Sequence, residues 1–445
     1  MTLATLATSL PTVVPAHGVG SRQDLPLPFT ALMVGAALAL VASFAGLAFL
    51  WREPRFTPDG GRPVPAGIQR VVDARWFRGG LGLLALLFTA YVLMALVVGS
   101  DDANNPVPYV VYVWLWVGMP FLSVLLGPVW PTLNPVRRLH RGVAALARIS
   151  PEVSLTDVRP GYWPAAAGLL AFTWLELVAP DRTTLPVLRV AVVLFLLVSV
   201  MGALVFGARW FREGDPFEVL SRLYGRLAPL GRRPDGRLVL RSPIQGPAVL
   251  EPRRGLLATL SVMLGGTAYD SLSADIRYAG WVQSTPAPDL VRTATLVAVV
   301  LLVAGALSAA AALSALVSGI PVRGTAAELA PSLLPIAAGY LVAHYWSLLM
   351  FQGPRTLALL SDPLGTGADW LGTAGTGGWG ALIQPTLVAV VQAGAIVLGH
   401  VLGVVVAHER SVRILPRRAA VLGQVPVMVL MVGYTVGGLS LLFSS

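Results

Sequence analysis

Long apolar runs without a charged side chain follow one another along the whole chain and predict its architecture. A helix needs roughly 20 apolar residues to cross the hydrocarbon core of a bilayer. Two shorter runs, 160–175 and 255–269, complete a span only if Glu176 and Asp270 lie within the membrane. The pattern predicts an all-α, polytopic bundle of about ten transmembrane helices, near 29–51, 79–99, 107–130, 162–180, 186–208, 255–275, 292–319, 330–352, 380–407 and 420–442.

The distribution of arginine predicts the orientation of these spans. Basic residues close to the ends of transmembrane helices accumulate on the cytoplasmic side. We therefore expect a multi-pass protein of the bacterial plasma membrane, with both termini extracytoplasmic and with 209–254 as a basic cytoplasmic loop. The arginines outnumber all other charged residues, and 26 of the 32 lie in the alternate loops 52–78, 131–161, 209–254, 320–329 and 409–418.

Composition narrows the range of functions. Charged residues make up only 12% of the chain, about half of the share in soluble proteins, which argues against a soluble enzyme. The net charge of +10 needs no nucleic-acid partner, because arginine clusters beside a membrane bind anionic lipid headgroups. The chain has no Cys, so disulfides, thiol nucleophiles and iron–sulfur clusters are excluded.

Ionisable residues inside a membrane are rare, face protein or water, and mark candidate functional sites. Five such residues fall within or at the end of the predicted spans: Glu176, Arg189, Asp270, His344 and His400. Glu176 and Arg189 lie at similar depths on consecutive helices. They are therefore expected either to form an ion pair that fixes the topology or to belong to a substrate or proton path.

The most informative polar residues lie in the outward-facing half of the bundle. Gly265 and Gly266 precede Tyr269 and Asp270, and paired glycines allow a neighbouring helix to approach closely. A second stripe, formed by Tyr340, His344 and Ser347, shares one face of a helix. We expect Asp270 and His344 to lie within about 8 Å of each other, because each needs a polar partner where there is no water.

These residues have two interpretations. They predict an outward-facing polar cavity in which Asp270 and His344 are the candidate catalytic or metal-binding pair, since a neutral imidazole binds metals and moves protons. The alternative is a set of hydrogen bonds between helices. Asp362, in an external loop rich in Gly and Pro, is expected at the mouth of the cavity.

Further candidates lie near the ends of the chain. Gln392 and His400 are expected to be buried polar groups, and His408 to lie at the level of the cytoplasmic headgroups. Haem ligation by His400 is disfavoured because its only deep partner, His344, lies at a different depth. Residues 1–16 resemble a weak export signal. Cleavage after them would expose His17, whose amine and imidazole form a chelate suited to copper(II), with His344 and Asp270 as further ligands.

Several of these segments together resemble a family of bacterial multi-pass membrane proteins that are commonly labelled fenitrothion hydrolase. The resemblance rests on residues 17–28, Gly265–Ser271, Ala343–Leu349 and Leu359–Gly365, with Gly399, His400 and the segment Ala407–Arg410. It implies hydrolysis of organophosphate triesters, although the chain lacks the dense His and Asp clusters of a two-metal phosphotriester site.

Three functions therefore follow from the sequence. The first is a membrane protein whose cavity handles a small solute or a metal ion. The second is a membrane-embedded enzyme, either a hydrolase or a copper-dependent redox protein. The third is an assembly partner of a membrane complex.

Overall fold

The computed structural model describes residues 22–419 and 421–443 and is almost entirely helical. Eight helical segments of the described chain are long and apolar enough to cross a membrane, which confirms the all-α, multi-pass architecture. They are α1 (Phe29–Leu50), α3 (Arg75–Val98), α4, η2 and α5 together (Pro106–Leu126), α9 (Leu185–Phe206), α15 (Pro288–Ser318), α16 to α17 (Thr325–Leu360), α18 (Pro385–Ile414), and η6 with α19 (Leu422–Leu442).

Two further predicted spans are helices that differ from these eight. Helix α8 (Trp163–Leu177) has 15 residues and is therefore only about 23 Å long, at 1.5 Å per residue. Helix α13 (Leu256–Ser273) carries Gly, Thr, Ser and Asp in its second half and is largely buried. It packs against α8, α15 and α17. Both helices lie within the bundle, and the total of ten spans stays a prediction.

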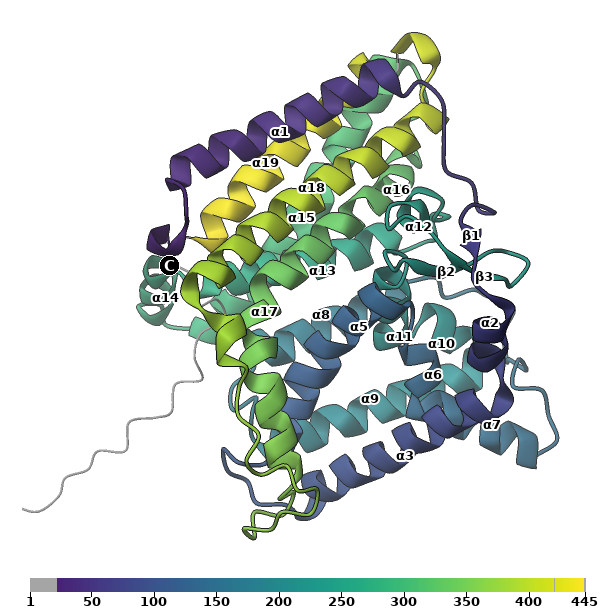
Figure 1. Ribbon diagram of the computed structural model, residues 1–445, viewed down its shortest axis with the longest axis vertical. Helices are drawn as coiled ribbons and strands as arrows, with labels where there is room; N and C mark the ends of the chain where they lie inside the picture. Colours follow the sequence, from purple (N-terminus) through teal and green to yellow (C-terminus); the bar gives the residue numbers. More distant parts are fainter. Residues whose placement is uncertain (1–21, 420, 444–445) are drawn as a thin grey trace, which may run out of the picture.

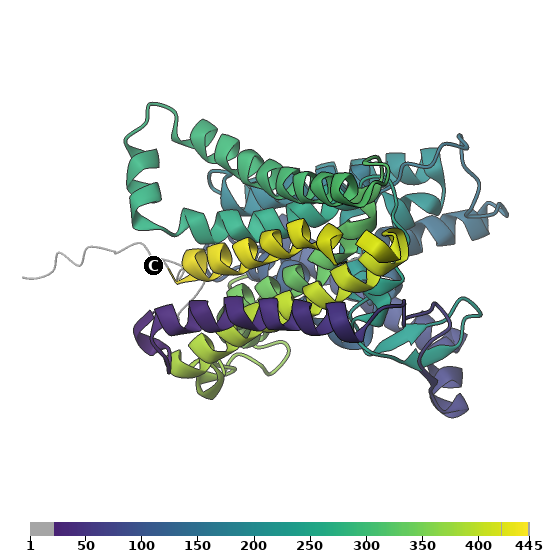
Figure 2. The same cartoon turned by 90° about the horizontal axis from the view of Figure 1, so that it is seen from above.

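Helix α17 (Leu333–Leu360) is the central helix of the bundle. It packs against α18, α13 and the π-helical segment η2 (Val110–Gly118), and most of its length is buried. Helix α19 (Val425–Leu442) lies between α1 and α15 (Figure 2) and contacts both. Helices α3 and α9 lie side by side at the opposite edge from α1 (Figure 1). The polar residues of α13 and α17 are thereby enclosed by apolar helices.

The predicted basic loop 209–254 is folded. Its strands β2 (Leu230–Arg232) and β3 (Leu238–Leu240) are antiparallel, and β3 also pairs with β1 (Arg62–Pro63), which belongs to another arginine-rich loop. The remaining short helices of the described chain are α2 (Ala66–Asp73), α6 (Trp130–Leu133), α7 (Pro135–Leu146), α10 (Arg209–Glu213), α11 (Pro216–Tyr224), α12 (Gln245–Ala248), α14 (Ile276–Gln283) and the 3-10 turns η1 (Arg22–Asp24), η3 (Ala330–Ser332), η4 (Gly380–Ile383) and η5 (Arg417–Ala419).

Buried polar contacts join helix α7 to the folded loop. The side chain of Asp215 caps α11 by accepting from the backbone N–H of Glu218, at 2.8 Å, and also accepts from Asn134 Nδ2, at 3.0 Å. Burial raises the pKa of Asp215 to about 7. Glu218 forms ion pairs with Arg137 and Arg222. These contacts hold two of the arginine-rich loops together.

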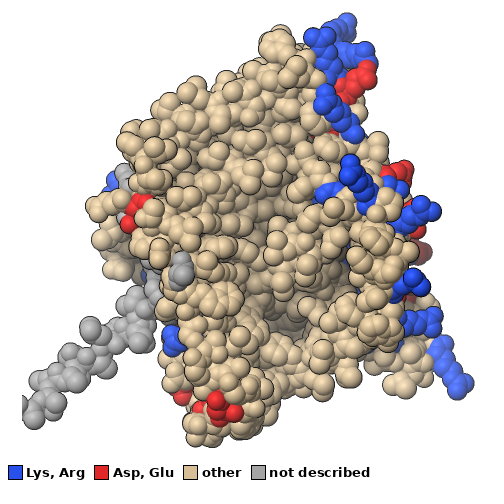
Figure 3. Space-filling view, viewed as in Figure 1, with Lys and Arg blue, Asp and Glu red and all other residues tan. Residues whose placement is uncertain are grey.

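Charge is distributed unevenly between the two ends of the bundle. Figure 3 shows basic side chains gathered along the right-hand edge, where α2, α7, α12 and the small sheet lie in Figure 1. Helix α14, the start of α1 and the end of α19 lie at the opposite end. The alternate loops that the sequence singled out are therefore gathered at the same end of the molecule.

We expect the arginine-rich end to face the cytoplasm. A reporter that is active only after export should be active when fused at residue 103 and inactive when fused at residue 230, because the arginine bias sets orientation. Cell fractionation and reporter activity measure this directly. Activity of the two fusions on the same side of the membrane would contradict the predicted topology.

Candidate functional site

Close packing of α13 positions the candidate site. A Cβ atom at Gly265 would lie 2.8 Å from the Cα atom of Val300, and one at Gly266 would lie 3.0 Å from the side chain of Thr173. Both glycines therefore allow α15 and α8 to approach more closely than larger residues would permit. Asp270 follows Gly266 by one helical turn, so the same approach places its carboxylate among the packed helices.

Asp270 and His344 form the centre of the site. The distance from His344 Nε2 to Asp270 Oδ2 is 2.7 Å, which confirms the expected proximity of these residues. The Tyr345 hydroxyl donates to the same carboxylate oxygen at 3.3 Å. The Ser271 hydroxyl lies 3.4 Å from His344 Nδ1. Asp270 is 5% exposed and His344 2% exposed, so the pair is sheltered from solvent.

Glu176 of α8 provides a second buried carboxylate beside this pair. It is 6% exposed, and neither of its oxygens has a hydrogen-bond partner within the described part of the chain. Its charge interacts with those of Asp270 and Arg182. The ring of Trp116, in the π-helical segment η2, lies nearby. π-Helical turns are frequent at functional sites, and this nine-residue π-helical segment lies against α17, which carries His344.

The predicted ion pair between Glu176 and Arg189 is wrong. Arg189 Nε donates to the backbone carbonyl of Leu96, at 2.8 Å, and Arg189 Nη2 donates to that of Val97, at 3.2 Å. These carbonyls belong to the last turn of α3, where backbone acceptors have no partner within the helix. Arg189 therefore provides hydrogen bonds to the backbone carbonyls at the end of α3. It does not balance the charge of the Glu176 carboxylate.

The predicted stripe on α17 divides between two neighbourhoods. Tyr340 donates to the backbone carbonyl of Tyr434 at 3.3 Å, and its ring packs edge-on against His400 at a centroid distance of 6.0 Å. Ser347 is buried. Tyr269 packs against the ring of Tyr278, at a centroid distance of 6.3 Å. The structure thus brings His344 to Asp270, while Tyr340 faces α18 and α19.

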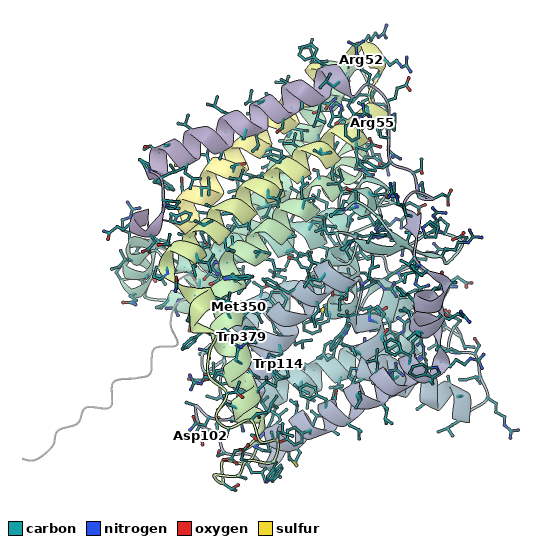
Figure 4. The ribbon with its side chains drawn as sticks, in the orientation of Figure 1. Arg52, Arg55, Asp102, Trp114, Met350 and Trp379 are labelled. Atoms are coloured by element: carbon teal, nitrogen blue, oxygen red, sulfur yellow. The ribbon has the colours of Figure 1, made fainter. Side chains whose placement is uncertain are left out.

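Asp362 stabilises its own loop. It accepts from the backbone N–H groups of Thr366, at 2.9 Å, and Gly367, at 2.6 Å. The bond from the Thr366 N–H lowers the pKa of the Asp362 carboxyl. The loop returns to α17, where the Trp379 N–H donates to the carbonyl of Met350 at 3.2 Å (Figure 4). Asp362 therefore stabilises this turn, and its predicted place at the mouth of a cavity stays a prediction.

The other histidines differ in their surroundings. His400 Nδ1 lies 2.8 Å from the carbonyl of Ile396, and both His400 Nε2 and Gln392 Oε1 lack a partner within the described chain. His408 is buried, and its two ring nitrogens lie 2.8 Å from Gln424 Oε1 and 2.7 Å from the carbonyl of Trp51. Its predicted depth at the level of the cytoplasmic headgroups stays a prediction. His17, the proposed copper chelate, lies outside the described residues.

Two members of the site were not predicted from the sequence. Tyr345 directly follows His344, and consecutive helical residues point about 100° apart, so the stripe argument overlooked it. Ser271 directly follows Asp270 in the same way. Both reach the pair at the contact of α13 and α17, where Tyr345 donates to Asp270 and Ser271 lies beside the His344 ring. The sequence signal that could have identified them is the presence of two consecutive polar residues in an apolar helix, His344 with Tyr345 and Asp270 with Ser271.

The site offers one imidazole and carboxylate oxygens as ligands. Among the described residues, no group of three His, Cys, Asp or Glu side chains is close enough together to hold a metal ion. The arrangement can exchange a proton between Asp270 and His344. Comparison with known family models, with curated proteins and with solved structures finds no match to this chain.

Proposed function

We propose that this membrane protein handles a cation at the buried Asp270–His344 pair, with the Glu176 carboxylate beside it as a source of negative charge, and that the pair is reached from the outer side of the membrane. The observation that supports the proposal most directly is the buried Asp270–His344 pair, at 2.7 Å, beside a carboxylate that has no hydrogen-bond partner in the described chain. Two carboxylates and one imidazole attract positive charge. Groups of this kind are costly inside a bilayer and are kept where they serve a function.

The donor atoms indicate which cations fit. Imidazole nitrogen and carboxylate oxygen together suit copper(II) and zinc better than the hard cations, which prefer oxygen alone. A metal ion bound at His344 Nε2 displaces the proton that this atom shares with Asp270, so binding releases a proton. Tyr345 and Ser271 hold the carboxylate and the ring in place through their hydroxyl groups.

Calorimetry on the purified, detergent-solubilised protein tests this function. We expect one copper(II) or zinc ion to bind per chain, with a proton released as measured by repeating the titration in buffers of different ionisation enthalpy. Sequencing of the mature N-terminus shows whether His17 is available as an additional ligand. Absence of metal binding would refute a metal site. If NMR also shows no pH-dependent change at His344, the pair does not bind a proton either, and the proposed cation site is refuted.

A second candidate function, hydrolysis, is favoured by one observation. Ser271, His344 and Asp270 form a chain of contacts of 3.4 Å and 2.7 Å, which is the order of groups in a serine hydrolase. However, Ser271 lies within α13, where backbone N–H groups are used by the helix and cannot form an oxyanion hole. Ser271→Ala should abolish triester hydrolysis if this function is correct, and should leave cation binding within a few-fold of the wild-type value if it is not.

A further inference from the structure

A groove between α1 and α18 shares no lining residue with the Asp270 site. Its volume is about 370 Å3. One wall is formed by the small side chains of Ala42, Ser43 and Gly46 on α1, and the other by Val401 and Val405 on α18. A Cβ atom at Gly46 would meet no other atom within 4 Å. The groove is therefore open, apolar and formed within two membrane-length helices.

The groove ends at Trp51 and Arg55, on the arginine-rich side of the molecule. The Arg55 guanidinium lies 4.4 Å from the centroid of the Trp51 ring, and Arg55 Nη2 donates to the carbonyl of Leu50 at 2.9 Å. Arg52 and Arg55 lie at the same end of α1 (Figure 4). The mouth of the groove thus combines an aromatic ring with exposed positive charge, as at membrane interfaces.

Buried contacts fix the position of Arg55. The Glu409 carboxylate is fully buried. It accepts from the backbone N–H of Arg55, at 3.0 Å, and from Trp51 Nε1, at 3.1 Å. Its charge is balanced by Arg413, at 2.7 Å. The Arg55 guanidinium makes no ion pair with the described residues, so it is available to an anion from outside the protein.

We propose that this groove binds an anionic phospholipid, with one acyl chain between α1 and α18 and the phosphate at Arg55. The charge at the mouth matches a phosphodiester, and the apolar walls match a hydrocarbon chain. A second copy of this chain or a partner helix would also bury the apolar walls of the groove. Neither of them accounts for the Arg55 guanidinium, which makes no ion pair with the described residues and lies at the proposed level of the lipid headgroups. The proposal is independent of the Asp270 site.

Native mass spectrometry of the delipidated protein with phosphatidylglycerol or phosphatidylcholine tests the proposal. We expect preferential retention of phosphatidylglycerol, and about fivefold weaker binding in Arg55→Ala, the factor for one basic residue at a lipid surface. Arg70→Ala, which removes another exposed arginine, is the matched control and should bind as the wild type does.

A second variant tests the groove itself. Gly46→Leu fills the open space between the helices and should remove the bound lipid. Gly35→Leu is its control on the same helix, since a Cβ there also meets no atom within 4 Å, and should retain the lipid. Equal retention of both lipids, an unchanged Arg55→Ala, or lipid bound to Gly46→Leu would overturn the proposal. A dimer that Gly46→Leu dissociates would assign the groove to a second copy instead.

Discussion

Replacing Asp270 with Asn is expected to weaken cation binding by at least about 100-fold. Loss of a residue that only orients a metal ligand weakens binding by 10–100-fold, and Asp270 is proposed as a direct ligand. Asn has the same shape as Asp but lacks its charge, so it still accepts the Tyr345 hydrogen bond observed at 3.3 Å. The measurement is calorimetry with copper(II) and zinc on the purified variant, compared with His344→Gln.

Asp362→Asn is the control for this experiment. Asp362 is also a carboxylate, but its oxygens accept hydrogen bonds from backbone N–H groups of its own loop. We expect the Asp362 variant to bind cations with the wild-type affinity. If Asp270→Asn and Asp362→Asn bind equally well, Asp270 is not a ligand and the pair with His344 is a structural hydrogen bond between helices.

The sequence predicted the centre of the site but not its surroundings. Asp270 and His344 stand out because a charged or polar group in an apolar run needs a partner, and this argument holds whatever the arrangement of helices. The structure confirms that the two residues are close, with 2.7 Å between His344 Nε2 and Asp270 Oδ2. The argument failed for Arg189, because a long side chain near a helix end has several acceptors within reach, and the carbonyls of Leu96 and Val97 were invisible in the sequence.

The same limit applies to the architecture. Runs of uncharged residues predicted the long helices because hydrocarbon imposes a minimum length on a span. They could not predict that α7, α11 and the three short strands fold together, since these contacts depend on tertiary packing between loops that are distant in sequence. Alternation of arginine along the chain predicted that these loops share one end, but not that they have a buried polar core.

Glu176→Leu is expected to stabilise the protein against unfolding while it impairs cation binding. A buried polar group without a hydrogen-bond partner costs about 1–3 kcal/mol, and both Glu176 oxygens lack one in the described chain. Leu has a similar volume and removes this cost, and buried charges replaced by apolar residues often give stabilisation of this kind. The melting temperature in detergent and the cation affinity should therefore change in opposite directions.

The comparison with Leu169→Ala makes this result interpretable. Leu169 lies on the same helix and is fully buried, so its truncation should lower stability by about 2–5 kcal/mol and show that the melting assay responds to packing in α8.

A Glu176→Leu variant that melts below the wild type would mean that Glu176 has a stabilising partner and is structural. A variant that melts higher and still binds cations normally would remove Glu176 from the site and leave Asp270 and His344 as its only acidic and imidazole ligands. A higher melting temperature with weakened binding is the outcome that the cation site requires, because a residue kept at the expense of stability must contribute to function.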